Sequence, residues 1–239
     1  MRIRFVGSGD AFGSGGRGQT CIHLSAEGQA LLVDCGATSL VALKAQGLNP
    51  QAVDAVAVTH LHGDHFGGLP FLILDGQFSH RTAPLLVAGP PGTRVRLTEA
   101  METLFPGSSR APRRFPVQVT ELAADGTPAK LGPATVRGWQ VEHACGAPPL
   151  ALRVDLGGAS FAYSGTRSGP RRWPKRPGER ICSPSRPTPS TGLSATTSTI
   201  RRCGPTSGRS AHTGSCSPTC PPTCSAGSPT PNRPQPATA

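Results

Sequence analysis

The hydrophobic and polar positions of residues 1–165 form short groups separated by glycine, proline and polar residues. Continuous or alternating apolar runs predict β-strands, whereas apolar positions three or four residues apart predict helices. The predicted strands are Arg2–Val6, Thr20–Leu24, Ala30–Asp34, Ala52–Val58, Leu85–Ala88, Val117–Leu122, Thr135–Val141, Leu150–Leu156 and Ser160–Tyr163. The predicted helices are Thr38–Gln46, Phe66–Leu74 and Pro91–Leu104. This order predicts an α/β fold in which strands dominate.

Three local patterns refine this picture. Glu27-Gly28, between the second and third predicted strands, is typical of a tight turn and predicts an antiparallel sheet at the N-terminus. The small apolar run Ala52–Val58 is typical of a strand covered on both faces. The segment Gly13–Gly18 has neither the ending of a Walker loop nor the spacing of a dinucleotide-binding fingerprint, so we interpret it as a flexible loop.

The composition changes sharply after Gly165. Residues 1–165 contain 13 Lys and Arg against 12 Asp and Glu, whereas residues 166–239 contain 11 Lys and Arg against one acid, Glu179. The net charge of +11 therefore lies almost entirely in the second segment, which is also rich in Ser, Thr and Pro. Such a segment buries too little apolar surface to offset roughly 1–2 kcal/mol of backbone entropy per residue. We expect one domain at 1–165, followed by a disordered basic tail at 166–239.

The chain has no apolar run near the ~20 residues that a membrane helix needs, so we expect no membrane association. Its N-terminus lacks the apolar core of a secretion signal, which predicts a cytoplasmic protein. Cysteines stay reduced in that compartment, so Cys21, Cys35 and Cys145 are expected to be free thiols in apolar surroundings. The later cysteines at 216, 220 and 224 lack the paired spacing of most metal sites.

A dense group of potential metal ligands follows the strand Ala52–Val58. Three histidines and one carboxylate lie within six residues: His60, His62, Asp64 and His65. In an extended backbone His60 and His62 point to the same side, and a turn at Gly63 would direct Asp64 and His65 to a second ion nearby. Zn²⁺ prefers such nitrogen and oxygen ligands, and Mn²⁺ or Fe also accepts them. A solvated histidine-rich loop or isolated core histidines are the alternatives.

The stretch from Thr59 to His65 resembles the His-x-His-x-Asp-His signature of the metallo-β-lactamase superfamily, whose fold is an αββα sandwich. Asp34, in the run Leu31–Gly36, resembles the earlier motif of that family, an Asp that closes a strand and braces the metal loop. A simple turn residue is its alternative role. His143, directly after the strand Thr135–Val141, resembles the motif in which one histidine completes the ligands of the first metal.

The segments Phe5–Gly9 and Pro84–Pro90 resemble the ribonuclease Z-like branch of that superfamily. The resemblance implies a metal-dependent hydrolase with a zinc-bound hydroxide as nucleophile and two zinc ions. It places His60, His62 and His143 around the first ion and Asp64 and His65 at the second. It also makes Asp64 the catalytic residue that orients the attacking water or accepts its proton. The favoured substrate is a phosphodiester, either a small molecule or a nucleic acid, with thioesters, lactones and other esters as alternatives.

The resemblance stops near Gly165. After a strand such as Ser160–Tyr163 the family has Gly-Asp-Thr, whose Asp bridges both metals, and later a further histidine ligand. Here Thr166 follows Gly165, and the only later histidine is His212, in the predicted tail. The chain therefore clearly encodes only the first half of the sandwich. We expect at most one ion and weak or absent hydrolysis.

A change of reading frame would explain this break. Joining the last base of each codon to the first two of the next permits Ser-Gly-Asp-Thr directly after Tyr163, and permits a strand ending in Thr-His within residues 210–225. We therefore hypothesise that one base is missing near the codon of Gly165. The competing interpretations are a nucleic-acid-binding protein that acts through a genuine basic tail, with a vestigial metal motif, and a non-functional translation product.

Overall fold

A computed structural model describes residues 1–167 of the chain. The strands are β1 (Arg2–Gly7), β2 (Cys21–Ala26), β3 (Gln29–Val33), β4 (Ala55–Ala57), β5 (Leu85–Gly89), β6 (Val117–Glu121), β7 (Ala129–Leu131), β8 (Ala134–Gln140), β9 (Leu150–Leu156) and β10 (Ala159–Tyr163). The helices are α1 (Ser39–Ala45), α2 (Gly63–Phe66), α3 (Leu69–Phe78) and α4 (Thr93–Leu104), with short 3₁₀ turns η1 (Ser14–Gly16) and η2 (Pro50–Ala52). The predicted tail, apart from its first two residues, lies outside this description.

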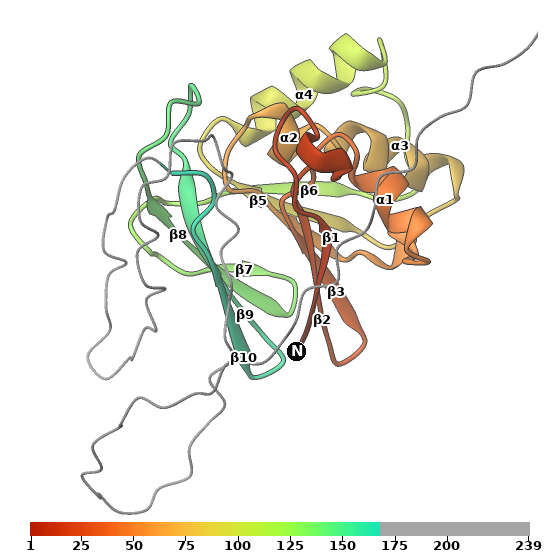
Figure 1. The fold of residues 1–239 in the computed structure, drawn as a ribbon. Coiled ribbons are helices and arrows are strands. Elements are labelled where there is room, and N and C mark those ends of the chain that lie inside the picture. Colours follow the sequence, from red (N-terminus) through yellow and green to blue (C-terminus); the bar gives the residue numbers. More distant parts are fainter. Residues whose placement is uncertain (168–239) are drawn as a thin grey trace, which may run out of the picture. The chain divides into compact units, whose positions relative to one another are not determined.

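Two sheets form the framework (Figure 1). The first has the order β1-β2-β3-β4-β5-β6, in which β1, β2 and β3 pair antiparallel and β3, β4, β5 and β6 pair parallel. The second has the order β10-β9-β8-β7 and is antiparallel throughout. The predicted α/β fold with an antiparallel N-terminal part is confirmed.

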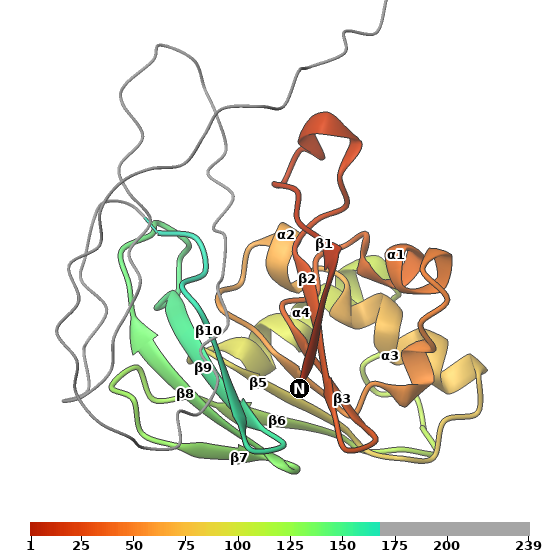
Figure 2. The same cartoon turned by 60° about the horizontal axis from the view of Figure 1, so that its bottom comes forward.

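Apolar side chains hold three layers together. One face of the first sheet packs against the helices through residues such as Leu43 of α1, Ile73 of α3 and Leu97 of α4. The other face packs against the second sheet, where Leu31 and Val33 share a buried cluster with residues of β8, β9 and β10. Figure 2 shows the helices on one side of the first sheet and the second sheet on the other. These layers correspond to the first three of an αββα sandwich.

Most predicted elements are present within a few residues of the expected bounds. The turn between β2 and β3 is tight as predicted, with a positive φ of 52° at Glu27 and 78° at Gly28, which suits the twist of a two-residue hairpin. β4 is buried along its whole length, as its apolar run indicates. No helix in this part of the chain is long and apolar enough to cross a membrane.

Two local expectations were wrong, and one strand was missed. The helix predicted at Phe66–Leu74 is two helices, because the amide of Gly68 instead donates to the carbonyl of Cys35 at 2.8 Å and Pro70 suits the first turn of a new helix. The strand predicted from Ala52 begins only at Ala55, after η2. The three-residue strand β7 was not predicted, because a run so short carries no periodicity.

Candidate metal centre

The predicted ligands gather where β4 leads into α2. His60 and His62 lie on the extended segment after β4, and Asp64 and His65 lie in the first turn of α2. His143 comes from the connection between β8 and β9 in the other sheet. The backbone joins the two sheets here, because the amide of Leu150 donates to the carbonyl of Thr59 at 2.8 Å. The carboxyl ends of parallel strands are a common place for such sites.

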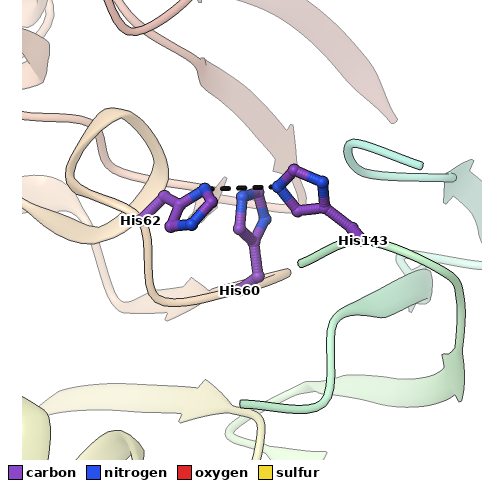
Figure 3. A group of neighbouring side chains, drawn as sticks. All are labelled: His60, His62 and His143. Atoms are coloured by element: carbon purple, nitrogen blue, oxygen red, sulfur yellow. Dashed lines mark hydrogen bonds between the residues drawn. The ribbon is translucent and has the colours of Figure 1, made fainter. Parts of the chain in front are cut away.

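His60, His62 and His143 form what we call the three-histidine cluster (Figure 3). Each offers one ring nitrogen, and these nitrogens all lie within 4.8 Å of one another. The ring centroids form a nearly equilateral triangle with sides of 4.8, 4.9 and 4.9 Å. Nδ1 of His62 lies 3.2 Å from Nε2 of His143. Three imidazoles that converge in this way can bind one metal ion.

The contacts of His60 distinguish its two ring nitrogens. Its Nδ1 lies 3.0 Å from Oγ1 of Thr59, and that hydroxyl also lies 3.0 Å from both carboxylate oxygens of Asp34. A carboxylate only accepts, so the Thr59 hydroxyl donates to Asp34 and accepts from Nδ1–H of His60. Nε2 of His60 then carries a lone pair, and this buried atom has no hydrogen-bond partner. The residues therefore fit a metal ion.

Charge and burial keep the cluster suited to a metal. Burial and the neighbouring imidazoles lower the pKa of His60 to about 3. Burial, followed by the charge of His62, also lowers the pKa of His143. Both rings therefore stay neutral at physiological pH, and neutral imidazole is the form that binds metals.

Asp34 is fully buried and lies behind the site. Its Oδ1 accepts from the Thr59 amide at 2.7 Å, and its Oδ2 lies 2.7 Å from Nδ1 of His65. Its backbone has a φ of 60°, a left-handed conformation that Asp tolerates better than most residues. Asp34 thereby orients the residue before His60 and one ring nitrogen of His65.

A second group lies beside the cluster. Nε2 of His65 lies 3.3 Å from Oδ2 of Asp64 and 3.3 Å from Oγ1 of Thr166. Burial acts to lower the pKa of His65, but the charge of Asp34 and the hydrogen bonds of Asp34 and Asp64 outweigh it and raise this pKa to about 9. The hydrogen bond from His65 is the main cause that lowers the pKa of Asp64.

The backbone behind the site packs without room for side chains. A Cβ atom on Gly36 would lie 2.3 Å from the carbonyl oxygen of Asp64, and the amide of Cys35 donates to the carbonyl of His65 at 2.6 Å. The loop after Asp34 therefore sets the position of α2. The chain turns at Gly63 as predicted, from extended backbone at His62 into α2, but Gly63 adopts no positive φ and has open space where a Cβ would be.

The structure thus brings all six predicted site residues into one region, with His60, His62 and His143 in one group and Asp64, His65 and Asp34 beside them. Three further residues take part that the sequence analysis did not single out as functional: Thr59, Gly36 and Thr166. Their places next to recognised motifs were the only signal. Cys21 and Cys35 are buried, as predicted, whereas Cys145 is half-buried and its Sγ donates to the carbonyl of Ala147 at 2.9 Å, so the apolar surroundings predicted for it were wrong.

The chain is similar to several known proteins. Residues 1–109 match the family model described as "Anti-Pycsar protein Apyc1". Ribonuclease Z of Agathobacter rectalis is 32% identical over 125 residues, covering 52% of this chain and 39% of that protein. Ribonuclease Z of Salinibacter ruber is 41% identical over 110 residues, covering 44% and 33%. The matched part therefore spans less than half the length of these relatives.

Two solved structures are also similar. The crystal structure of human tRNase Z, short form, superposes with a TM-score of 0.59 at 26% identity, covering 71% of this chain and 70% of that one. The metallo-β-lactamase fold protein YhfI of Bacillus subtilis superposes with a TM-score of 0.54 at 20% identity, covering 68% and 61%. The second likeness concerns the fold alone.

Proposed function

We propose that the chain is a ribonuclease Z-like protein of the metallo-β-lactamase superfamily and that residues 1–167 form the metal-binding part of a phosphodiester hydrolase. The observation that carries this proposal is the convergence of His60, His62 and His143, with the unpartnered Nε2 of His60 buried among them. A buried polar atom without a partner is costly, and a metal ion would satisfy it.

The three-histidine cluster would hold zinc, since imidazole nitrogen is a preferred zinc ligand, with Mn²⁺ or Fe as alternatives. When bound, such an ion acts as a Lewis acid and makes water a stronger acid. Asp64 lies beside the cluster and is partly accessible to solvent, with a lowered pKa that keeps it ionised. Its carboxylate can orient an attacking water and accept its proton. Asp34 and Thr59 hold His60 in the required orientation.

We propose that this chain holds one ion rather than two. Apart from the three-histidine cluster, the groups gathered at the site within residues 1–167 are Asp64 and His65, with the neutral hydroxyl of Thr166 beside them. One carboxylate, one imidazole and one hydroxyl form a weak set for a second zinc. Hydrolysis by this chain is expected to be weak or absent for that reason.

The experiment that tests the metal site measures zinc bound to the purified full chain by elemental analysis after dialysis. About one zinc per chain is expected for a set of three histidines that leaves one coordination position open. His60→Ala should abolish binding, whereas His80→Asn, at an exposed histidine on a connecting loop, should not. Zinc retained by His60→Ala, or lost from both variants, would contradict the proposal.

Activity is tested separately. A model phosphodiester, bis(p-nitrophenyl) phosphate, and a lactone are compared with and without a chelator. Chelator-sensitive hydrolysis of the phosphodiester alone supports the favoured substrate class, whereas chelator-sensitive hydrolysis of the lactone alone supports an ester hydrolase. Robust turnover would contradict the expected weak activity.

Two sequence hypotheses lead to their own tests. If one base is missing near the codon of Gly165, resequencing the genomic DNA across codons 162–170 should reveal the extra base. If instead the chain binds nucleic acid through residues 166–239, with their net charge of +10, removing them should abolish binding, and binding should weaken steeply with salt. The cytoplasmic location stays a prediction.

A further inference from the structure

The outer strands of the two sheets differ in how well they are protected against pairing with another chain. Among residues 1–167 the outer strands are β1 and β6 of the first sheet and β7 and β10 of the second. An outer strand leaves a row of backbone donors and acceptors free. Proteins commonly protect such a row with charged side chains, proline, an irregular register or a very short strand.

Three of these strands carry such protection. β1 contains Arg2 and Arg4, and its register with β2 shifts near its end. β6 ends in the charged residue Glu121, and β7 has only three residues, one of which is Lys130. β10, in contrast, has the sequence Ala-Ser-Phe-Ala-Tyr, without charge or proline, and pairs with β9 in an unbroken register. In the described part of the chain, β10 is therefore the outer strand that is open to another strand.

The turn before β10 shows which of its backbone groups are free. Gly157 and Gly158 form a two-residue turn with φ values of 54° and 70°. The two residues that flank such a turn exchange both backbone hydrogen bonds, and bonded and non-bonded pairs then alternate. Every second residue of β10, beginning with Ala159, therefore bonds to β9. The amides and carbonyls of Ser160 and Ala162 point away from β9.

A second copy of β10 fits this edge in antiparallel orientation. Pairing centred on Phe161 places Ser160 of one copy opposite Ala162 of the other, and each of these residues has its amide and carbonyl directed outward. Asp155 lies beside Ser160 and Arg153 beside Ala162, so Asp155 of one copy shares a row with Arg153 of the other and no like charges align. The arrangement has two-fold symmetry and closes at two copies.

The surroundings of β10 favour a second copy over a segment of the same chain. Phe5 of β1 lies opposite Ile22, which belongs to the cluster between the sheets, so its ring is on the side that faces the second sheet, yet it is 52% exposed. β1 and β10 lie at the same side of the two sheets (Figures 1 and 2). Residues 168–239 contain 14 prolines, which lack the amide that a ladder needs, so the sequence predicts no competing strand there.

We propose that two copies of this chain associate through β10 and form one continuous sheet across both molecules. A single pair of short strands buries less than the ~1,200 Å² of a stable standard interface, so the dimer is weak and reversible. The inference goes beyond the proposed hydrolysis, because β10 holds none of the predicted site residues.

The test measures sedimentation equilibrium of the full chain from micromolar to sub-millimolar concentrations, together with backbone hydrogen exchange. Ala162→Pro removes an amide that points away from β9, a change that an outer strand tolerates. Ala162→Lys keeps the backbone and adds a charge at an exposed position of the edge. Gln118→Lys is the matched control, because it adds the same charge at an exposed position of β6, which already ends in a charge.

We expect the unmodified chain and Gln118→Lys to form dimers as the concentration rises. Both Ala162 variants should raise the dissociation constant at least about tenfold, because the two-fold symmetry places each substitution in the interface twice. The amides of Ser160 and Ala162 should exchange more slowly in concentrated than in dilute solutions of the unmodified chain. The melting temperature of each variant shows whether its fold is intact, and Ala162→Lys decides the outcome if Ala162→Pro is unstable.

Three results would overturn the proposal. The unmodified chain could stay monomeric at sub-millimolar concentration. Ala162→Lys could dimerise as tightly as the unmodified chain, which would place the interface on another surface. The amides of Ser160 and Ala162 could be protected equally at every concentration, which would mean that a segment of the same chain covers this edge.

Discussion

Thr59 links the buried carboxylate of Asp34 to the first imidazole of the three-histidine cluster. Its hydroxyl both donates to Asp34 and accepts from His60, so one oxygen fixes the tautomer of His60. Losing a hydrogen bond that orients a metal-binding histidine typically lowers the metal affinity about 10- to 100-fold. Asp34 therefore acts on His60 through the uncharged side chain of Thr59.

Replacing Thr59 with Val keeps the shape of the side chain and removes the hydroxyl. Zinc affinity is expected to fall about 10- to 100-fold, because His60 loses the acceptor that holds its Nδ1–H. Calorimetric zinc titration measures the change. Thr59→Ser retains the hydroxyl and should bind nearly as well as the unmodified chain. Equal affinities for the Val and Ser variants would show that Thr59 does not orient His60.

Oγ1 of Thr166 lies 3.3 Å from Nε2 of His65, next to the carboxylate of Asp64. Thr166→Asp should raise the bound zinc from about one to about two ions per chain, because a charged oxygen would join Asp64 and His65. Thr166→Asn, which adds no charge, should leave the content at about one. Elemental analysis of both dialysed variants decides the matter, and a content of one in the Asp variant would refute the incomplete-site explanation.

The sequence predicts different site residues to different degrees. His60, His62, Asp64 and His65 are recognisable because they lie within six residues, where backbone alternation alone brings pairs together. His143 is 81 residues from His62 along the chain, so only the resemblance to a family could place it. The contact of Thr166 with His65 joins residues 101 positions apart, so the local sequence could not predict it.

At the scale of elements, the loop after β3 packs closely against helix α2 because Gly36 has no side chain. The amides of Cys35 and Ala37 donate to the carbonyls of His65 and Gly63 at 2.6 and 3.2 Å. These bonds require the two backbones to approach at Gly36, where a Cβ would lie 2.3 Å from Asp64. The positions of Asp64 and His65, two predicted ligands, therefore depend on Gly36, which has no side chain that could bind a metal.

Gly36→Ala is expected to destabilise the fold by about 1–3 kcal/mol, the usual cost of overpacking, and to weaken zinc binding. Gly63→Ala is the matched control, since its Cβ would meet open space and its φ is not positive. Urea unfolding followed by circular dichroism gives both free energies. Equal stability of the two variants would contradict the close approach at Gly36.

The predictions of elements succeeded or failed for a physical reason. β2, β3 and β9 were found because their apolar residues alternate or run continuously over five or more positions. The division between α2 and α3 was missed because it depends on the bond from Gly68 to Cys35, a contact between segments distant in sequence. Where the apolar pattern continues without a break, tertiary contacts therefore decide where a helix or strand begins and ends.

At the scale of the molecule, the three-histidine cluster joins the two sheets. His60 and His62 follow β4 of the first sheet, and His143 lies between β8 and β9 of the second. A metal held by all three would therefore bind only when the sheets are packed together. Ligands that bind the folded state alone stabilise it by mass action, by about 2.7 kcal/mol at a hundred times the dissociation constant.

Zinc should accordingly raise the melting temperature of the unmodified chain, and a chelator should reverse the rise. For a domain of this size, a stabilisation of 2.7 kcal/mol corresponds to roughly 5–11 °C. His143→Ala should lose most of the rise in melting temperature. His60 and His62 remain, but both follow the first sheet, so a metal that they hold no longer links the two sheets. His80→Asn should respond as the unmodified chain does. A full response in His143→Ala would mean that zinc binds the first sheet alone and that the second sheet contributes nothing to the metal site.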